Sequence, residues 1–190
     1  AHTGKEGLNI IHKYIKALTK KIKCKYNEVL VSSTGVIGEK FNPSLIINKI
    51  EKINSKNKNS LLESAKAIMT TDTFPKVSIT NIKLDSQSFK IYGIAKGSGM
   101  IQPNMGTMLV YIFTDALIKK NVLQSYLSEI NERTFNSISV DSDTSTSDTV
   151  LMAATGKSGI LVEKNHTGFL DALTCLMTDL AHQVVKDGEG

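Results

Sequence analysis

The nearly unbroken apolar run at residues 107–116, TMLVYIFTDA, constrains the fold more than any other stretch of the sequence. A strand at the centre of a sheet typically reads as a continuous apolar run, whereas a strand with one solvated face alternates apolar and polar residues. The run therefore predicts a central strand. Its neighbours in the sheet, and the helices that cover it, must come from the rest of the 190 residues.

Apolar residues predict further strands on both sides of this run. Between 77 and 94 they alternate on either side of the turn-forming sequence DSQS, which predicts a β-hairpin. The alternation slips in phase between Ile79 and Ile82. Three more short apolar stretches are expected to be strands, EVLVSS at 28–33, NSISV at 136–140 and TVLMAAT at 149–155.

Apolar residues at helical spacing predict several amphipathic helices. Capping signals mark three helix starts, Thr3 with Glu6, Asn42 before Pro43, and Ser60 with Glu63. Gly188 fits the C-terminal cap of the last helix. The helices are expected at 5–23, from Pro43 to Ile53, from Ser60 to about Met69, at 119–133 and at 167–186.

Helices and strands mix without strict alternation along the chain. The fold class is therefore α/β or α+β, a layered domain in which mixed sheets pack against helices. We find neither an internal repeat nor a domain linker, so residues 1–190 are expected to form one domain. Because the sequence starts without Met and stops at VVKDGEG, we expect it to be a piece of a longer polypeptide.

The charge pattern argues against a nucleic-acid partner. The net charge is +5 and the pI is about 9.1, but the lysines are scattered, Arg133 is the one arginine and Trp is absent. A nucleic-acid surface normally gathers Lys and Arg and adds a motif of aromatic residues. Scattered positive charge instead favours a solvated surface that attracts small anionic substrates.

The cysteines and the apolar runs bear on the compartment. Cys24 and Cys175 lie far apart, and neither belongs to a CxxC motif or a Cys/His cluster, which is typical of reduced cysteines. No apolar run reaches the length of a membrane span, and no signal peptide is recognised. We therefore expect a cytoplasmic protein that has no membrane partner.

Three motifs resemble known binding loops and fail in detail. ATGKSG at 154–159 lacks the first P-loop glycine, because that position holds Leu151, so a turn at a strand end explains it better. DSDTSTSD at 141–148 lacks the glycine and glutamate of a calcium loop, whose positions hold Thr146 and Met152. It is expected to be a loop packed by its own hydroxyl side chains, and a supporting role near a site stays open. GSGM misses the third glycine of a dinucleotide fingerprint, and the histidines show no metal spacing, so we expect no metal and no cofactor.

The Gly106–Thr107 step is the remaining candidate for chemistry. A threonine hydroxyl needs a neighbouring base, and a threonine that begins a chain can use its own α-amine, with a pKa of ~7.7. That requires cleavage before Thr107, and a preceding glycine leaves the carbonyl open to attack. A Gly-Thr pair that merely opens a strand is the common alternative, and the pair alone leaves both interpretations open.

The surroundings of this step closely resemble a known signature. KGSGMIQPNMGTML at 96–109 resembles the bifunctional ornithine acetyltransferase / glutamate N-acetyltransferase family of arginine biosynthesis. The resemblance covers nearly the whole chain and implies the fold and activity of that family. Four other segments agree in order and rough spacing, SSTGVIG at 32–38, AIMTTDTFPK at 67–76, DSDTSTSDTV at 141–150 and DGEG at 187–190.

The resemblance implies self-cleavage between Gly106 and Thr107, at a position where the family usually has Ala before the Thr. The halves 1–106 and 107–190 would stay together in an α2β2 assembly. Thr107 would take the acetyl group from N-acetylornithine, release ornithine and pass the acetyl group to glutamate. No cofactor is implied, and the sequence leaves open whether acetyl-CoA is also an acetyl donor.

The resemblance also implies roles for five other residues. Thr34 and Gly35 match an oxyanion hole, in which the Thr34 hydroxyl and the Gly35 N–H hold the tetrahedral oxygen. Thr73, Lys96 and Glu189 match substrate-binding residues, and Thr107 also contacts substrate. A lysine suits an amino-acid carboxylate, and Glu189 suits the amino group of ornithine. Without the resemblance, Lys96 and Glu189 would be interpreted as surface charges.

Two other classes of function stay open at this point. The same nucleophile serves related amidases and aminopeptidases, in which water takes the acyl group. A non-catalytic chain that binds amino acids, or only assembles with other parts, is the third interpretation. Acetyl release without glutamate distinguishes the first two classes, and absence of cleavage and of acetyl-Thr107 favours the third.

Overall fold

The computed structural model describes residues 2–54, 60–84, 87–101, 108–143, 145 and 147–188. By their contacts the residues divide into two compact units, unit 1 (Ala1–Asn59) and unit 2 (Ser60–Gly190). Each unit is described by itself. That residues 1–190 form one domain stays a prediction.

Unit 1 consists of two helices and a long irregular segment. The helices are α1 (Gly4–Ile22) and α2 (Pro43–Glu51), with a short 3-10 helix, η1 (Tyr26–Glu28), between them. The Asn42 side chain caps α2 by accepting the Ser44 N–H at 2.9 Å, as its sequence predicts. The two helices pack together around a small core of four buried residues, Ile10, Tyr14, Ile15 and Ile50.

Two predictions for unit 1 are wrong. Thr3 makes no side-chain capping bond to α1, and the Glu6 carboxylate instead forms an ion pair with Lys40 at 2.6 Å. The predicted strand at 28–33 is irregular after η1. Its residue Leu30 is 74% exposed. An apolar run becomes a strand only beside a partner strand, and no sheet of the described residues includes 28–33.

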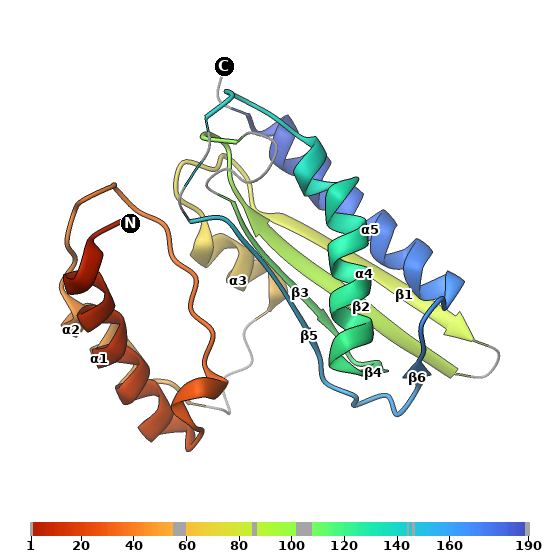
Figure 1. Cartoon of the computed structure of the whole chain (residues 1–190), viewed down its shortest axis with the longest axis horizontal. Helices are drawn as coiled ribbons and strands as arrows, with labels where there is room; N and C mark the ends of the chain where they lie inside the picture. The colour runs from red at the N-terminus through yellow and green to blue at the C-terminus, as the bar shows by residue number, and fades with distance from the viewer. Residues whose placement is uncertain are drawn as a thin grey trace. The chain divides into compact units, whose positions relative to one another are not determined.

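Unit 2 is built on a mixed four-stranded sheet (Figure 1). The predicted hairpin and central strand are confirmed, and the spatial order is β1-β2-β3-β5. The first two neighbouring pairs are antiparallel, and β3 pairs with β5 in parallel. The strands are β1 (Lys76–Leu84), β2 (Gln87–Lys96), β3 (Leu109–Thr114) and β5 (Thr149–Ala154).

Three helices accompany this sheet. Ser60 and Glu63 form the predicted capping box at the start of α3, with bonds of 3.1 and 2.8 Å. Helix α5 packs on β1 and β2, and α4 packs on α5 and β5 (Figure 1). Among the helices of the described residues, none combines the length and the apolar character that crossing a bilayer requires. The helices are α3 (Leu61–Ile68), α4 (Lys120–Glu132) and α5 (Thr167–Lys186).

Two short strands that the sequence did not predict form a second, parallel sheet, β4 (Leu117–Ile118) with β6 (Leu161–Val162). The predicted strand at 136–140 is wrong, because the 3-10 helix η2 (Phe135–Ser137) occupies its start. Val140 donates its N–H to the Ile101 carbonyl at 2.7 Å, but one such bond does not make a ladder. Gly188 follows the C-cap Asp187, and a Cβ on it would lie 2.9 Å from Val140 Cγ1.

The main core lies between one face of the sheet and α5. Gly93 of β2 allows the close approach of the helix, because a Cβ there would lie 2.9 Å from Leu180 Cδ1. The phase slip in the hairpin now has a structural reason. Ile82 pairs with Phe89 in this core, whereas Ile79 lies on the opposite face and is 59% exposed.

Candidate active site

The strand directions bring several chain ends to one end of the main sheet. There β1 begins and β2 ends, since Lys76 lies opposite Ala95. Beside them β3 and β5 both begin, since Leu109 lies opposite Lys96 and also opposite Thr149. We call this the site end of the sheet. Helix α5 also finishes here, as the contacts of Asp187 show.

A lysine and two aspartates are buried together at the site end. The Lys76 Nζ lies 2.7 Å from Asp72 Oδ1 and 2.5 Å from Asp187 Oδ2. All three side chains are 0–1% exposed, and Lys76 also lies 4.8 Å from the centre of the Phe74 ring. A buried cation between two carboxylates is neutralised by them, and the carboxylates in turn need their other lone pairs satisfied.

Backbone amides satisfy those lone pairs and tie distant segments together. Asp72 accepts the Gly97 N–H at 2.7 Å and the Thr70 N–H at 3.0 Å. Asp187 accepts the Thr73 N–H at 3.0 Å and also binds the Thr73 hydroxyl. Burial raises the pKa of both carboxyls, but these bonds and Lys76 outweigh it and hold each pKa below its usual value.

Lys96 ends β2 inside this cluster. It is 3% exposed, so it is not a solvated surface charge. Burial lowers its pKa, and the nearby Lys76 adds to that effect, while Asp72 and Asp148 oppose it. Next along the chain, the buried Ser98 shares a 2.7 Å hydrogen bond with the Thr71 hydroxyl.

Asp148 stands at the start of β5 and faces the start of β3. Its Oδ1 accepts the Met108 N–H at 2.6 Å. Its Oδ2 is buried and accepts no hydrogen bond from the described residues. Burial raises the pKa of this carboxyl to about 7, although the Met108 amide and the positive charge of Lys96 lower it.

Asp141, at the start of the DSDTSTSD loop, bonds to the backbone at Met100 and Ile101. Its carboxylate accepts the Ile101 N–H at 2.8 Å and also binds the Met100 N–H. These bonds hold its pKa below its usual value, although burial raises it. Among the described residues, no group of His, Cys, Asp and Glu gathers in a way that could hold a metal ion. The DSDTSTSD loop therefore supplies carboxylates to backbone amides at both ends of 101–108.

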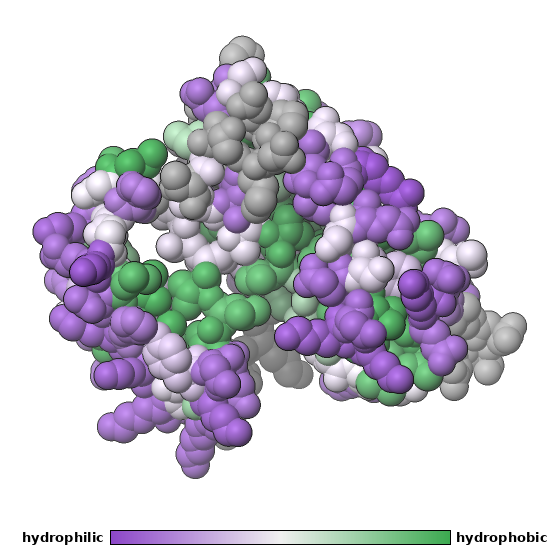
Figure 2. Space-filling view, viewed as in Figure 1, coloured by the Kyte–Doolittle hydropathy of each residue, from purple (hydrophilic) through white to green (hydrophobic). Residues whose placement is uncertain are grey.

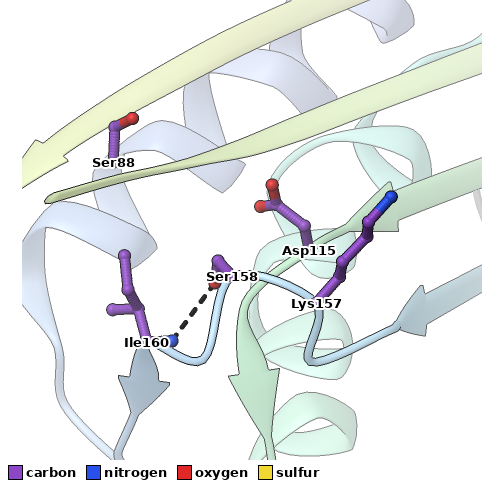
Figure 3. Close-up of a pocket in the computed structure, with 5 residues that line it drawn as sticks. All are labelled: Ser88, Asp115, Lys157, Ser158 and Ile160. Atoms are coloured by element: carbon purple, nitrogen blue, oxygen red, sulfur yellow. Dashed lines mark hydrogen bonds between the residues drawn. The ribbon is translucent and has the colours of Figure 1, made fainter.

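The opposite end of the sheet carries a separate open pocket of about 420 Å³ (Figure 3). Its lining includes Asp115, which accepts the Lys90 N–H at 2.7 Å, and Ser158, whose hydroxyl accepts the Ile160 N–H at 3.2 Å. The ATGKSG segment forms the turn after β5, which confirms the interpretation as a strand-end turn. Lys157 of this turn also lines the pocket.

Comparison with known proteins supports a family assignment. The family model described as ArgJ matches residues 1–190. This chain belongs to the ArgJ family. The arginine biosynthesis bifunctional protein ArgJ of Ruegeria pomeroyi is 48% identical over 100% of this chain and 47% of its own length. The glutamate N-acetyltransferase of Methanocaldococcus jannaschii is 43% identical over 98% of this chain and 47% of its own length.

The chain thus spans about half the length of the curated ArgJ-family relatives that it matches. The ArgJ protein of Bartonella henselae is similar to it at 45% identity over the whole chain, with 48% of that protein covered. The resemblance to the ornithine acetyltransferase / glutamate N-acetyltransferase family is confirmed at the level of family.

The predicted site residues of this ArgJ-family chain fall into three groups. Thr73 and Lys96 both lie at the site end of unit 2, where the Thr73 N–H bonds to Asp187 and the Gly97 N–H, next to Lys96, bonds to Asp72. Thr34 lines a pocket of about 260 Å³ within unit 1, beside Ser33 and the first turns of α1, and the exposed Gly35 follows it. The other three, Gly106, Thr107 and Glu189, lie outside the described residues.

Sequence reasoning missed the aspartates and the lysine that organise this end. Asp72, Asp148 and Asp187 look like ordinary turn or helix-end residues, and Lys76 like a solvated strand start. A signal did exist, because all four residues lie inside the segments at 67–76, 141–150 and 187–190 that carry the family resemblance. Only the fold reveals that Asp72, Lys76 and Asp187 are buried and bonded together, and that Asp148 accepts the Met108 N–H.

Proposed function

We propose that this chain carries part of an acetyltransferase that moves the acetyl group of N-acetylornithine to glutamate. The acetyl group would pass through Thr107, after self-cleavage between Gly106 and Thr107. One observation supports this most. The site end gathers Thr73, Lys96 and the Met108 amide, whose nitrogen is bonded directly to Thr107. The names of the relatives, ArgJ and glutamate N-acetyltransferase, agree with this activity.

The buried Lys96 supplies a cation for an amino-acid carboxylate. A charge-assisted bond in a site that excludes water is stronger than one at the surface. Thr73 stands next to Asp72, and Asp187 holds its backbone, so its position is fixed against α5. Glu189 follows Asp187 by two residues in the sequence, and we propose that it binds the amino group of ornithine.

The chemistry of transfer then needs a base and an oxyanion hole. The α-amine of Thr107, neutral above a pKa of ~7.7, would take the hydroxyl proton as the oxygen attacks the acetyl carbonyl. We propose that the Thr34 hydroxyl and the Gly35 N–H of unit 1 stabilise the tetrahedral oxygen. Removal of one such donor typically costs about 2.7–4 kcal/mol of transition-state stabilisation.

The same proposal extends to the fold, the assembly, the cellular location and the acetyl donor. We propose that the fold is that of the ornithine acetyltransferases, with residues 1–190 in one domain. The cleaved parts 1–106 and 107–190 would remain together in an α2β2 assembly. The free Cys24 and Cys175 fit a cytoplasmic location. Acetyl-CoA as a second acetyl donor would need no cofactor site, because it would act as a substrate.

Intact mass spectrometry of the full-length protein under denaturing conditions tests the cleavage. We expect two fragments that meet between Gly106 and Thr107, and a single uncut chain for Thr107→Ala. Thr155→Ala, at the opposite end of the sheet, is the matched control and should cleave like the wild type. An uncut wild-type chain, or a cleaved Thr107→Ala variant, contradicts the proposal.

A second measurement separates transfer from hydrolysis. Incubation with N-acetylornithine should add one acetyl group to the fragment that begins with Thr107, and glutamate should then remove it. Acetate release that is equally fast without glutamate would instead identify a hydrolase. A cleaved protein that never becomes acetylated would identify a binding or assembly role.

A further inference from the structure

Asp148 contacts the chain directly after the proposed nucleophile but has no part in the steps above. Its Oδ1 accepts the Met108 N–H at 2.6 Å. That nitrogen is bonded to the carbonyl carbon of Thr107. The next atom is the Thr107 Cα, which carries both the α-nitrogen and the side chain with its hydroxyl. The Asp148 carboxylate is thus held a few bonds from both reacting groups.

The second oxygen of this carboxylate has spare bonding capacity. Oδ2 is buried and accepts no hydrogen bond from the described residues. A buried acceptor without a donor costs about 1–3 kcal/mol, so a native structure normally supplies a donor. Cleavage before Thr107 would create one, because an amide N–H becomes an amine with several N–H groups.

We propose that Asp148 is a positioning residue for the α-amine of Thr107. The inference rests on the proposed function, because that amine exists only after cleavage. Oδ1 keeps the Met108 N–H, and Oδ2 accepts one N–H of the amine. The arrangement is then a nucleophile, its base and a third group that orients the base, as in other nucleophilic enzymes.

The proton balance assigns Asp148 no proton of its own. When the Thr107 oxygen bonds to the acetyl carbon, its proton passes to the α-amine, which becomes an ammonium group. When the carbon–nitrogen bond to ornithine breaks, the ammonium returns that proton to the departing nitrogen. The Asp148 carboxylate stabilises the ammonium between these events and stays ionised throughout.

The electrostatics of the site give this role a pH signature. Among the described residues, the groups that act on Asp148 are the Met108 amide at the start of β3 and Lys96 at the end of β2. With its pKa raised to about 7, the carboxyl is ionised above that pH and neutral below it. The transfer rate should therefore fall as the pH drops below the pKa of the amine, and fall further below about 7, where Asp148 becomes neutral. An ionised Asp148 also favours the ammonium form of the amine and so raises the pKa of the amine.

Asp148→Asn in the full-length protein tests the proposal. Asn keeps the size and a carbonyl oxygen for the Met108 N–H, but it loses the charge. We expect cleavage as in the wild type, a kcat about 100-fold lower and a KM for glutamate within about twofold. The acidic limb of the rate profile should move about one pH unit lower, because the amine loses its carboxylate.

Asp115→Asn is the matched control. Asp115 also uses one carboxylate oxygen to accept a backbone N–H, from Lys90 at 2.7 Å, but at the opposite end of the sheet (Figure 3). The same atom is replaced and the same charge is lost. Its rate and its pH profile should match those of the wild type.

Asp148→Glu keeps the charge and covers the case in which the Asn variant does not fold. Its acidic limb should stay near that of the wild type even where its rate falls. Two results overturn the proposal. The first is an acidic limb of the pH–rate profile that shifts in Asp148→Glu as it does in Asp148→Asn. The second is an Asp148→Asn variant that shows the same kcat and the same acidic limb as the Asp115→Asn control. An uncut Asn variant with a wild-type melting temperature also overturns it, because Asp148 would then act in cleavage. If the wild type neither cleaves nor becomes acetylated at Thr107, the proposed function itself has failed.

Discussion

The two units of the chain differ in how they use their apolar residues. Unit 2 buries its large apolar side chains between a sheet and α5, where Leu176 and Leu180 are 0% exposed. Unit 1 buries only a few, and Leu30, Val36 and Leu45 are 66–74% exposed. Figure 2 shows polar side chains along α1 and apolar ones gathered to one side of unit 1. A small helical pair can bury a smaller fraction of its apolar surface than the larger sheet unit can.

The charged residues of the two units differ in the same way. The Lys40–Glu6 pair of unit 1 has side chains that are 61% and 56% exposed. Lys76 in unit 2 has an exposed fraction of 0% and contacts two equally buried carboxylates. Exposed pairs contribute little to stability, whereas removal of one member of a buried cluster leaves uncompensated charge in a medium of low dielectric constant.

The largest expected effect therefore comes from Lys76→Met. The change leaves Asp72 and Asp187 facing each other without their cation, and we expect unit 2 to lose about 3–5 kcal/mol. Lys40→Met in unit 1 should cost less than about 1 kcal/mol. Hydrogen exchange of backbone amides in urea reports each unit separately and measures both effects. Equal losses for the two variants would show that burial of the cluster does not matter.

Gly93→Ala should have a smaller effect on unit 2. The added Cβ would lie 2.9 Å from Leu180 Cδ1 and 3.2 Å from Leu176 Cδ2, so α5 must shift away from β2. Overpacking of this kind costs about 1–3 kcal/mol. Gly168→Ala, on helix α5 itself, is the control, because a Cβ at Gly168 would meet nothing closer than 3.5 Å. The urea midpoint of unit 2 should fall only for Gly93→Ala, and a fall for both variants would contradict the close-packing argument.

Much of the fold follows from local sequence signals. The helices α2, α3, α4 and α5 and the hairpin β1–β2 form where spacing and caps predict them, because those signals act within a few residues. The strands predicted at 28–33 and 136–140 do not form. Both segments have suitable apolar residues, but strand formation depends on a partner, which no short stretch of sequence reveals.

The site was less accessible to sequence reasoning than the fold. The resemblance identified Thr73 and Lys96, and the structure brings both to one end of the sheet. It did not identify Lys76 or Asp187, which lie 111 residues apart in the sequence and bond to each other. A carboxylate that serves a distant amide has the same local sequence as one in a solvated turn, so only the tertiary structure separates them.

The smallest expected effect compares helix starts in the two units. Ser60 accepts the Glu63 N–H at 3.1 Å at the start of α3, whereas the Thr3 side chain makes no capping bond at the start of α1. Ser60→Ala should therefore destabilise α3 by about 1 kcal/mol.

Thr3→Ala should change the stability of α1 by much less, although Thr3 and Ser60 carry the same capping signal in the sequence. Hydrogen exchange at the first turns of the two helices measures the difference. A Thr3→Ala loss as large as that of Ser60→Ala would mean that Thr3 caps α1 in solution after all. The capping signal in the sequence would then stabilise the first helix of both units. The difference between the units would be only in how many side chains they bury.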